Sequence, residues 1–272
     1  MFAINYILKK PEFIIPWGNE EKDLHWFGLT DGVLWIDVGD AVIYEYQEPH
    51  SDSFGTQVKY NDYQLARFLE DFLALSSVIS ESVPKLLYDS IDTIADDLEA
   101  LKSKYIDKSD DEFDSFYDEY YLPVSEWYYN RCMDSGHLVC GPHIGFFRCD
   151  DKLRLVWTTH RKDEGTELWK YPNGSYEMLY SEFVSEVSRF IKNFTCDMDK
   201  QVADVVKNGI PGVYVDTDAL IRENTQRKDT FMAQVKSINS TGVRETDWKR
   251  VLALYDRMRK EVNILAEDER EA

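Results

Sequence analysis

The chain has 272 residues, 43% hydrophobic and 14% aromatic, which excludes a disordered chain and suffices for one large or two modest cores. Its 51 acidic and 31 basic residues give a net charge of −20, which argues against a protein that holds nucleic-acid phosphates. No apolar run reaches the roughly 20 residues of a membrane span, and the N-terminal lysines follow the apolar stretch, the reverse of a secretory signal. Four cysteines without tight pairing suit a reducing compartment. We therefore expect a cytoplasmic protein with no membrane or nucleic-acid partner.

The N-terminal part of the chain has the pattern of β-strands. Polarity alternates over the first eight residues, as in a half-buried strand. Farther on, two β-branched and aromatic runs flank Gly39 and Asp40. Because glycine supplies the positive φ that a tight turn needs, this pattern predicts a hairpin over residues 33–46.

The middle of the chain is predicted to be helical, and strands return after it. Apolar residues recur at spacings of three and four over 62–73, 82–101 and 113–131, the stripe of amphipathic helices. Residues 138–180 then alternate again and contain the turn signal Pro172-Asn173-Gly174, which predicts further antiparallel strands. A helix over 181–208 and two C-terminal helices complete the prediction.

Strands that are separated from helices, instead of alternating with them, favour an α+β fold. We expect an antiparallel β-sheet, with hairpins near 33–46 and 138–180, packed against several amphipathic helices and a C-terminal helical pair. The turn at 209–212 suggests a boundary between a main body over 1–209 and the helical pair over 210–272. Because the pair is short, we expect it to dock on the same body.

The acidic residues are densest between Asp89 and Glu119, where twelve acids face three lysines. Carboxylates interleaved with aromatic rings can bind a basic protein, since the charges steer the partner and the rings form desolvated contacts. The alternative is a solvated helix face opposite a buried aromatic stripe. The candidate steering charges are Asp110, Asp111, Glu112, Asp114, Asp118 and Glu119, and the candidate anchors are Phe116, Tyr117, Tyr120 and Tyr121.

The common catalytic motifs are missing: the sequence has no nucleophile elbow, phosphate-binding loop, zinc-protease motif or dinucleotide fingerprint. His25, Asp31 and Asp37 could form an acid/base site beside three tryptophans, since aromatic walls shift pKa values usefully. Alternatively, Asp31 belongs to a turn, Asp37 faces solvent and His25 bonds to the backbone. Whether the protein is an enzyme stays open, and the balance is against it.

A metal site also has to be weighed. Thiolate and imidazole are zinc ligands, and several lie close together in the sequence. They are Cys132, His137, Cys140, His143 and Cys149. Because no Cys-x2-Cys knuckle is present and alternation points strand neighbours to opposite faces, buried free cysteines are the favoured interpretation. We expect no metal and no other cofactor.

The C-terminal helix is basic in an acidic protein. Its positive residues suit either intramolecular packing or a self-association surface, so a homo-oligomer is possible. They are Lys249, Arg250, Arg257, Arg259 and Lys260.

Several segments together resemble a known family. They are Pro16-Trp17-Gly18, the stretch Leu24-His25-Trp26-Phe27-Gly28-Leu29-Thr30-Asp31-Gly32, Trp127-Tyr128 with Arg131, Ile210-Pro211-Gly212-Val213 and Thr246-Asp247-Trp248. The chain resembles an uncharacterised bacterial family known only as a domain of unknown function. The resemblance implies one architecture over most of the chain and brings no activity, ligand or catalytic residue.

These observations lead to three functional hypotheses. The first is an acidic cytosolic binding protein, such as an immunity protein or antitoxin that masks a basic toxin. The second is an enzyme of unrecognised class with its site around His25, Asp31 and Asp37, and the third is a structural or oligomerisation module.

Overall fold

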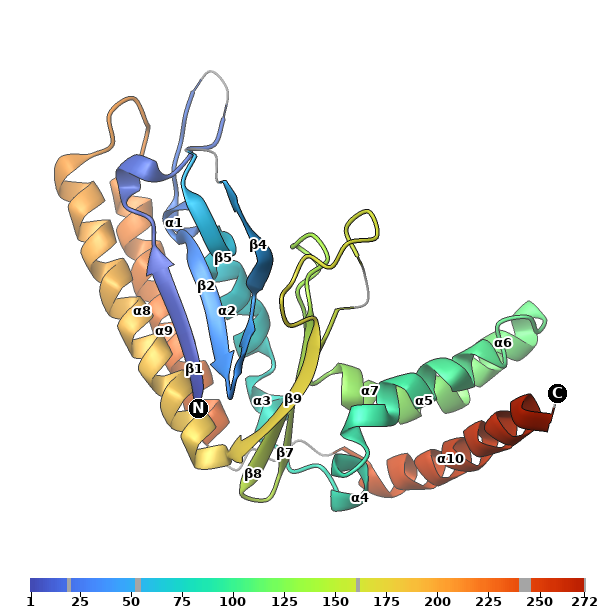
Figure 1. Cartoon of the computed structure of the whole chain (residues 1–272). Helices are drawn as coiled ribbons and strands as arrows, with labels where there is room; N and C mark the ends of the chain where they lie inside the picture. Colours follow the sequence, from blue (N-terminus) through green and yellow to red (C-terminus); the bar gives the residue numbers. More distant parts are fainter. Residues whose placement is uncertain (19–20, 52–54, 160–161, 240–245, 272) are drawn as a thin grey trace.

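The computed structural model describes residues 1–18, 21–51, 55–159, 162–239 and 246–271. The chain forms two antiparallel sheets, a pair of long helices beside the first sheet, and a helical arm that projects from the second (Figure 1). Antiparallel sheets with separate helices confirm the α+β class.

The first sheet has the strand order β1-β2-β5-β4, with the short β3 paired to the end of β2. Its strands are β1 (Phe2–Leu8), β2 (Asp31–Val38), β3 (Ala41–Ile43), β4 (Glu45–Ser51) and β5 (Gln57–Gln64). The predicted hairpin is present as β2 and β3, and Gly39 adopts a φ of +62° in its turn. It is shorter than expected because the chain leaves β2 after Ile43 and pairs β4 with β5 instead.

Helices cover the buried face of this sheet. The long ones are α8 (Tyr180–Asn208) and α9 (Thr217–Asn239), which lie side by side (Figure 1). The others here are η1 (Pro11–Phe13), α1 (Trp26–Leu29), α2 (Leu65–Ala74) and α3 (Ser76–Ile79). Large apolar side chains fill the space between sheet and helices, among them Trp26, Phe72, Phe183, Phe190 and Phe194. This set is the centre of the first core.

The second sheet borders both hydrophobic cores. Its strands are β6 (Cys132–Asp134), β7 (His143–Cys149), β8 (Lys152–Thr158) and β9 (Asn173–Leu179), in that order. Because side chains alternate along a strand, Phe146 and Leu155 join the first core, while Phe147 and Val156 turn to a second one.

The second core lies inside the helical arm. We define the arm as α5 (Ile91–Ser103), α6 (Asp110–Phe116), the π-helical turn η2 (Tyr117–Tyr121), α7 (Leu122–Tyr129) and α10 (Trp248–Glu271), with the short α4 (Lys85–Tyr88) at its base (Figure 1). The two helices expected over 210–272 are both present, but they pack against different parts of the molecule. The first, α9, packs against α8, and the second, α10, packs against α5 and α7.

A buried ion pair fixes the arm to the sheets. Arg131, which follows α7, donates from Nη2 to Oε2 of Glu81 at 2.6 Å, and both side chains are at least nine-tenths buried. The hydroxyl of Thr246, just before α10, donates to the same carboxylate at 2.8 Å. The Arg131 guanidinium also lies 5.3 Å from the centre of the Trp248 ring. One carboxylate therefore joins the ends of two arm helices to the loop before α4.

Candidate functional site

The arm carries most of the predicted acidic site on its surface. Ion pairs engage the acids nearest the sheets and the partner helix: Asp89 with Lys85, Asp92 with Arg154 and Asp97 with Arg259. Apart from Glu112, which caps α6, the remaining acids are exposed and, within the described part of the chain, have no ion-pair partner. They are Asp96, Glu99, Asp107, Asp110, Asp111, Asp114, Asp118 and Glu119. We call this set the acidic face.

Local chemistry explains how the acidic face is formed. Glu112 accepts hydrogen bonds from the main-chain N–H and the hydroxyl of Ser109, which starts α6 with a capping box. These bonds hold the pKa of Glu112 below its usual value, so this carboxylate serves the helix terminus. Pro123 lacks an N–H to bond the carbonyl of Glu119, and the helix passes this point through η2, where Leu122 N–H bonds to Tyr117.

Three of the four predicted anchors are core residues, so their assignment as surface anchors is wrong. Phe116, Tyr120 and Tyr121 are only 6%, 3% and 6% exposed. The Phe116 ring stacks on Tyr105 with centroids 3.8 Å apart, and the Arg257 guanidinium lies 4.0 Å from the centre of the Tyr120 ring. Their burial follows from the contact between α6, η2 and the rest of the arm.

Other apolar side chains are exposed beside the acids. Tyr117, the fourth candidate anchor, is 37% exposed, and Leu122 and Tyr129 are 40% and 43% exposed. Tyr117 stacks on Tyr121 at 5.5 Å, and Tyr121 is hydrogen-bonded to Tyr129, so the two exposed rings share a buried neighbour. The negative charge of Glu99 acts on both Tyr121 and Tyr129, which places this carboxylate beside the rings.

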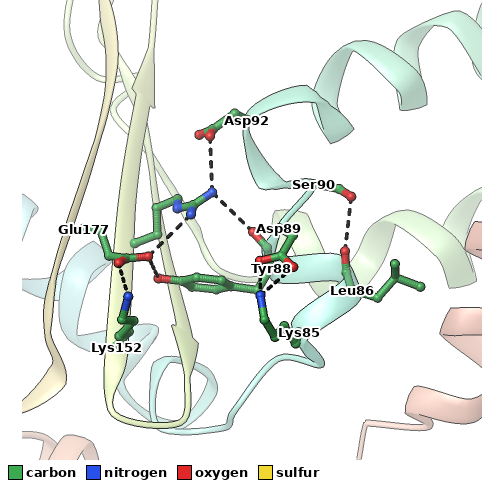
Figure 2. Close-up of polar contacts among 9 residues, drawn as sticks. Lys85, Leu86, Tyr88, Asp89, Ser90, Asp92, Lys152 and Glu177 are labelled. Carbon is green, nitrogen blue, oxygen red and sulfur yellow. Dashed lines mark hydrogen bonds and ion pairs between the residues drawn. The ribbon is translucent and has the colours of Figure 1, made fainter.

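The base of the arm is an ordered polar cluster (Figure 2). Glu177 of β9 accepts hydrogen bonds from Lys152 at 2.6 Å and from the Tyr88 hydroxyl at 2.9 Å. Arg154 of β8 bridges the same carboxylate, at 3.4 Å, and Asp92 of α5, at 3.2 Å. The cluster sets the direction in which α5 leaves the sheet, so it orients the acidic face.

Two arginines of α10, Arg257 and Arg259, form their contacts within the arm. Arg259 pairs with Asp97 at 2.7 Å, and Arg257 pairs with Glu261 at 2.9 Å while it covers Tyr120. Of the two interpretations of this helix, intramolecular packing accounts for both arginines.

The alternative catalytic site is not assembled. Asp31 and Asp37 stand near opposite ends of β2, which at about 3.3 Å per residue puts them roughly 20 Å apart. Asp31 pairs with Lys9 at 3.2 Å and Asp37 accepts a hydrogen bond from Asn5 at 2.8 Å. Burial raises the pKa of Asp31 against the opposing effect of Lys9. His25 packs edge-on against the Trp17 ring, with centroids 4.4 Å apart.

The cysteines and histidines that were weighed as zinc ligands are also dispersed. Within the described residues, no group of three or more His, Cys, Asp and Glu side chains could hold a metal ion. The Cys132 thiol donates to the Tyr128 carbonyl at 3.4 Å, and burial raises the pKa of this thiol to about 12. Cys149 lies at the other end of β7 from His143.

One cavity is lined by residues from two segments that the sequence analysis did not place together. It has a volume of about 490 Å³ and lies between α2 and the segment around β6. Oδ2 of Asp71 is 3.0 Å from Nε of Arg67 and 3.9 Å from Nδ1 of His137. Burial raises the pKa of Asp71 and lowers that of His137. No local pattern could have found this pair, because α2 and the loop after β6 meet only in the folded chain.

Comparison with known proteins gave a family and nothing more specific. The profile of a family described as "Family of unknown function (DUF5984)" matches residues 3–254. Comparisons with curated proteins and with solved structures gave no match. Among the described residues, none of the helices has the length and apolar character to cross a membrane. The matched segment contains both sheets and most of the arm, and the chain belongs to the DUF5984 family.

Proposed function

We propose that the protein binds a basic protein partner through the acidic face of its arm. The observation that carries the proposal is the set of exposed acids on α5, α6 and η2 that lack ion pairs within the described residues, although the chain contains 31 basic residues. Because self-repulsion among these charges costs stability, an external cation is their natural complement.

The exposed apolar residues supply the short-range part of this binding. Tyr117, Leu122 and Tyr129 lie among the acids, and aromatic residues on a charged surface are typical interface anchors. The negative field would raise the rate of encounter with a basic partner, and the rings would set its lifetime. We assign anchoring to these three side chains in place of Phe116, Tyr120 and Tyr121.

The finer form of the proposal concerns the partner's role. The resemblance to a bacterial family and the net charge of −20 suit an immunity protein or antitoxin that acts in the cytosol and occludes the basic cleft of a toxin. Toxins that attack nucleic acids or nucleotides need such clefts for phosphate groups.

The test uses two variants with the same change in net charge. In one, Asp110, Asp111, Asp114 and Asp118 are replaced by lysine. In the matched control, the exposed acids Asp40, Glu48, Glu182 and Asp229, which lie outside the arm, are replaced by lysine. Each protein is used as bait in the native bacterial lysate at low and high salt, and the product of the neighbouring gene is sought among the retained proteins. Association rates are then measured with the retained partner.

We expect the wild type and the control to retain one basic protein at low salt. The arm variant should associate with it at least tenfold more slowly, and with a weaker salt dependence, because steering depends on the local field. Equal rates for the arm variant and the wild type, or the lack of a basic partner at either salt, would refute the proposal.

A further inference from the structure

Three extended segments from distant parts of the chain meet at the end of the molecule away from the arm. Trp17 and Asp23 exchange main-chain hydrogen bonds of 2.9 Å in both directions. On the other side of Asp23, Leu24 N–H donates to Tyr214 O at 3.1 Å and Tyr214 N–H donates to Lys22 O at 2.8 Å. Asp23 is therefore the middle residue of a three-stranded arrangement, antiparallel to Trp17 and parallel to Tyr214.

This pairing fixes the direction of the three side chains. Residues directly opposite each other on adjacent strands project to the same face of a sheet. Trp17, Asp23 and Tyr214 therefore stand in one row, and strands about 4.8 Å apart place the two aromatic residues roughly 10 Å from each other at their Cα atoms. Lys22 and Leu24 project to the opposite face.

All three side chains are open to solvent. Trp17 is 45% exposed, Tyr214 is 67% exposed, and Asp23 is exposed as well. Within the described part of the chain, the Asp23 carboxylate has neither a hydrogen bond nor an ion pair. Exposed aromatic rings on both sides of a carboxylate form an apolar patch with a polar centre, and such patches are typical of interaction sites.

The backbone holds this row in place. Gly18, next to Trp17, has a φ of +87°, and a Cβ there would stand 2.1 Å from the Glu21 carbonyl oxygen, so only glycine fits. On its other side the Trp17 ring meets the His25 ring edge-on at 4.4 Å. An antiparallel bridge between Ile210 and Val213 closes the turn that comes directly before Tyr214.

We propose that Trp17, Asp23 and Tyr214 form a binding site for the guanidinium group of an arginine side chain presented by a protein partner. A planar guanidinium stacks on aromatic faces and donates two parallel hydrogen bonds to a carboxylate, and the row offers both kinds of contact. A lysine ammonium gains less here, because it cannot stack as a plane or donate in a fork. The site is separate from the acidic face and does not depend on the proposed function of the arm.

The test measures binding of N-acetyl-arginine amide by ¹⁹F NMR on the full chain labelled with 5-fluorotryptophan. The Trp17 resonance is assigned with Trp17→Phe, and ionic strength is held constant with sodium chloride. We expect a saturable shift of the Trp17 resonance at millimolar ligand, with the buried Trp26 resonance unchanged. N-acetyl-lysine amide and tetramethylammonium serve as competing cations.

Variants separate the contributions of the row. Asp23→Asn should weaken binding about tenfold, because it removes the charge under the ligand. Tyr214→Leu should weaken it roughly two- to fivefold through the loss of one stacking face. Asp40→Asn, at the exposed turn of the first sheet, is the matched control and should bind as the wild type does.

The outcomes are distinct from those of the arm experiment. An unchanged Trp17 resonance, or equal binding by Asp23→Asn and wild type, would overturn the assignment. Equal or stronger binding of tetramethylammonium would overturn it too, since that cation needs only the aromatic rings. A failure here leaves the acidic face untouched, because none of the residues of the row belongs to it.

Discussion

At the scale of single residues, Glu177 shows how charge is used structurally in this protein. Its carboxylate binds Lys152, Arg154 and the Tyr88 hydroxyl, and Lys152, the largest influence, lowers its pKa from the usual 4.5. A lowered pKa in the folded state means that the ionised carboxylate stabilises the fold. This stabilisation is present above pH 4.5 and is lost as the pH falls through the lower folded-state pKa.

Glu177→Gln should therefore reduce the free energy of unfolding by about 1 kcal/mol at pH 7, since the pairs are partly exposed. The difference from wild type should shrink as the pH is lowered below 4.5. Urea denaturation at a series of pH values measures both effects. Glu48→Gln, an exposed acid on β4, is the control and should change little at any pH. A gap that stays constant with pH would show that the charge of Glu177 is not the cause.

The sequence predicted the exposure of some side chains of the arm and not of others. The acids of the arm could be predicted to be exposed, because a dense run of carboxylates has no other place. The neighbouring rings could not be sorted: Tyr117 is exposed and Phe116 is buried, although both lie in one aromatic run. The choice depends on which face of the helix meets Tyr105 and Arg257, which pack from elsewhere in the chain.

At the scale of elements, β8 and β9 pack closely where an indole ring of one strand lies against a glycine of the other. Trp157 and Gly174 face each other across the two strands, and a Cβ at residue 174 would stand 2.3 to 2.9 Å from atoms of the indole ring. The ring has little room to move, because its Nε1 donates to the Tyr171 carbonyl at 3.0 Å and its other side belongs to the first core.

Gly174→Ala should therefore destabilise the protein by about 1 to 3 kcal/mol, the usual cost of overpacking a core. Ser175→Ala, one residue along β9 on the open face, should stay within about 0.5 kcal/mol of wild type. Urea denaturation of both variants is the measurement. Similar small effects would mean that Trp157 can shift away from β9 without cost.

Elements were predicted better than their pairing. The alternation over 138–180 and the turn at Pro172-Asn173-Gly174 correctly predicted antiparallel strands, and the helix over 181–208 was predicted almost to its ends. Within the helix predicted over 113–131, Pro123 does not end the helix, because the chain passes it through a π turn. Local patterns also could not show that α9 and α10 join different cores, since both carry ordinary amphipathic stripes.

At the scale of the whole molecule, the two cores share one sheet, and the second core depends on the first more than the first depends on the second. The floor of the second core is the outer face of β7 and β8, and the inner face of the same strands is part of the first core. Opening the arm leaves the first core covered by its own helices. Opening the first core removes the support of the strands on which the arm rests, so we expect the stability of the two parts to be hierarchical.

Two methionines test this hierarchy. Met258 of α10 is fully buried in the second core, and Met198 of α8 is equally buried in the first. Each change to alanine should cost about 2 to 5 kcal/mol by leaving a cavity. Hydrogen exchange followed by mass spectrometry should show faster exchange of α5, α6 and α10 in Met258→Ala, with α8 and α9 unchanged. Met198→Ala should accelerate exchange in both groups of helices.

The asymmetry between the two variants is the informative result. If Met258→Ala also accelerated α8 and α9, the sheet would transmit the opening of the arm and the two cores would unfold as one unit. If Met198→Ala left the arm protected, the arm would not need the inner face of β7 and β8. The expected asymmetry would instead mean that the arm, which carries the acidic face, can open without unfolding the first core. A partner bound to the acidic face would then protect α5, α6 and α10 from exchange before any other helix.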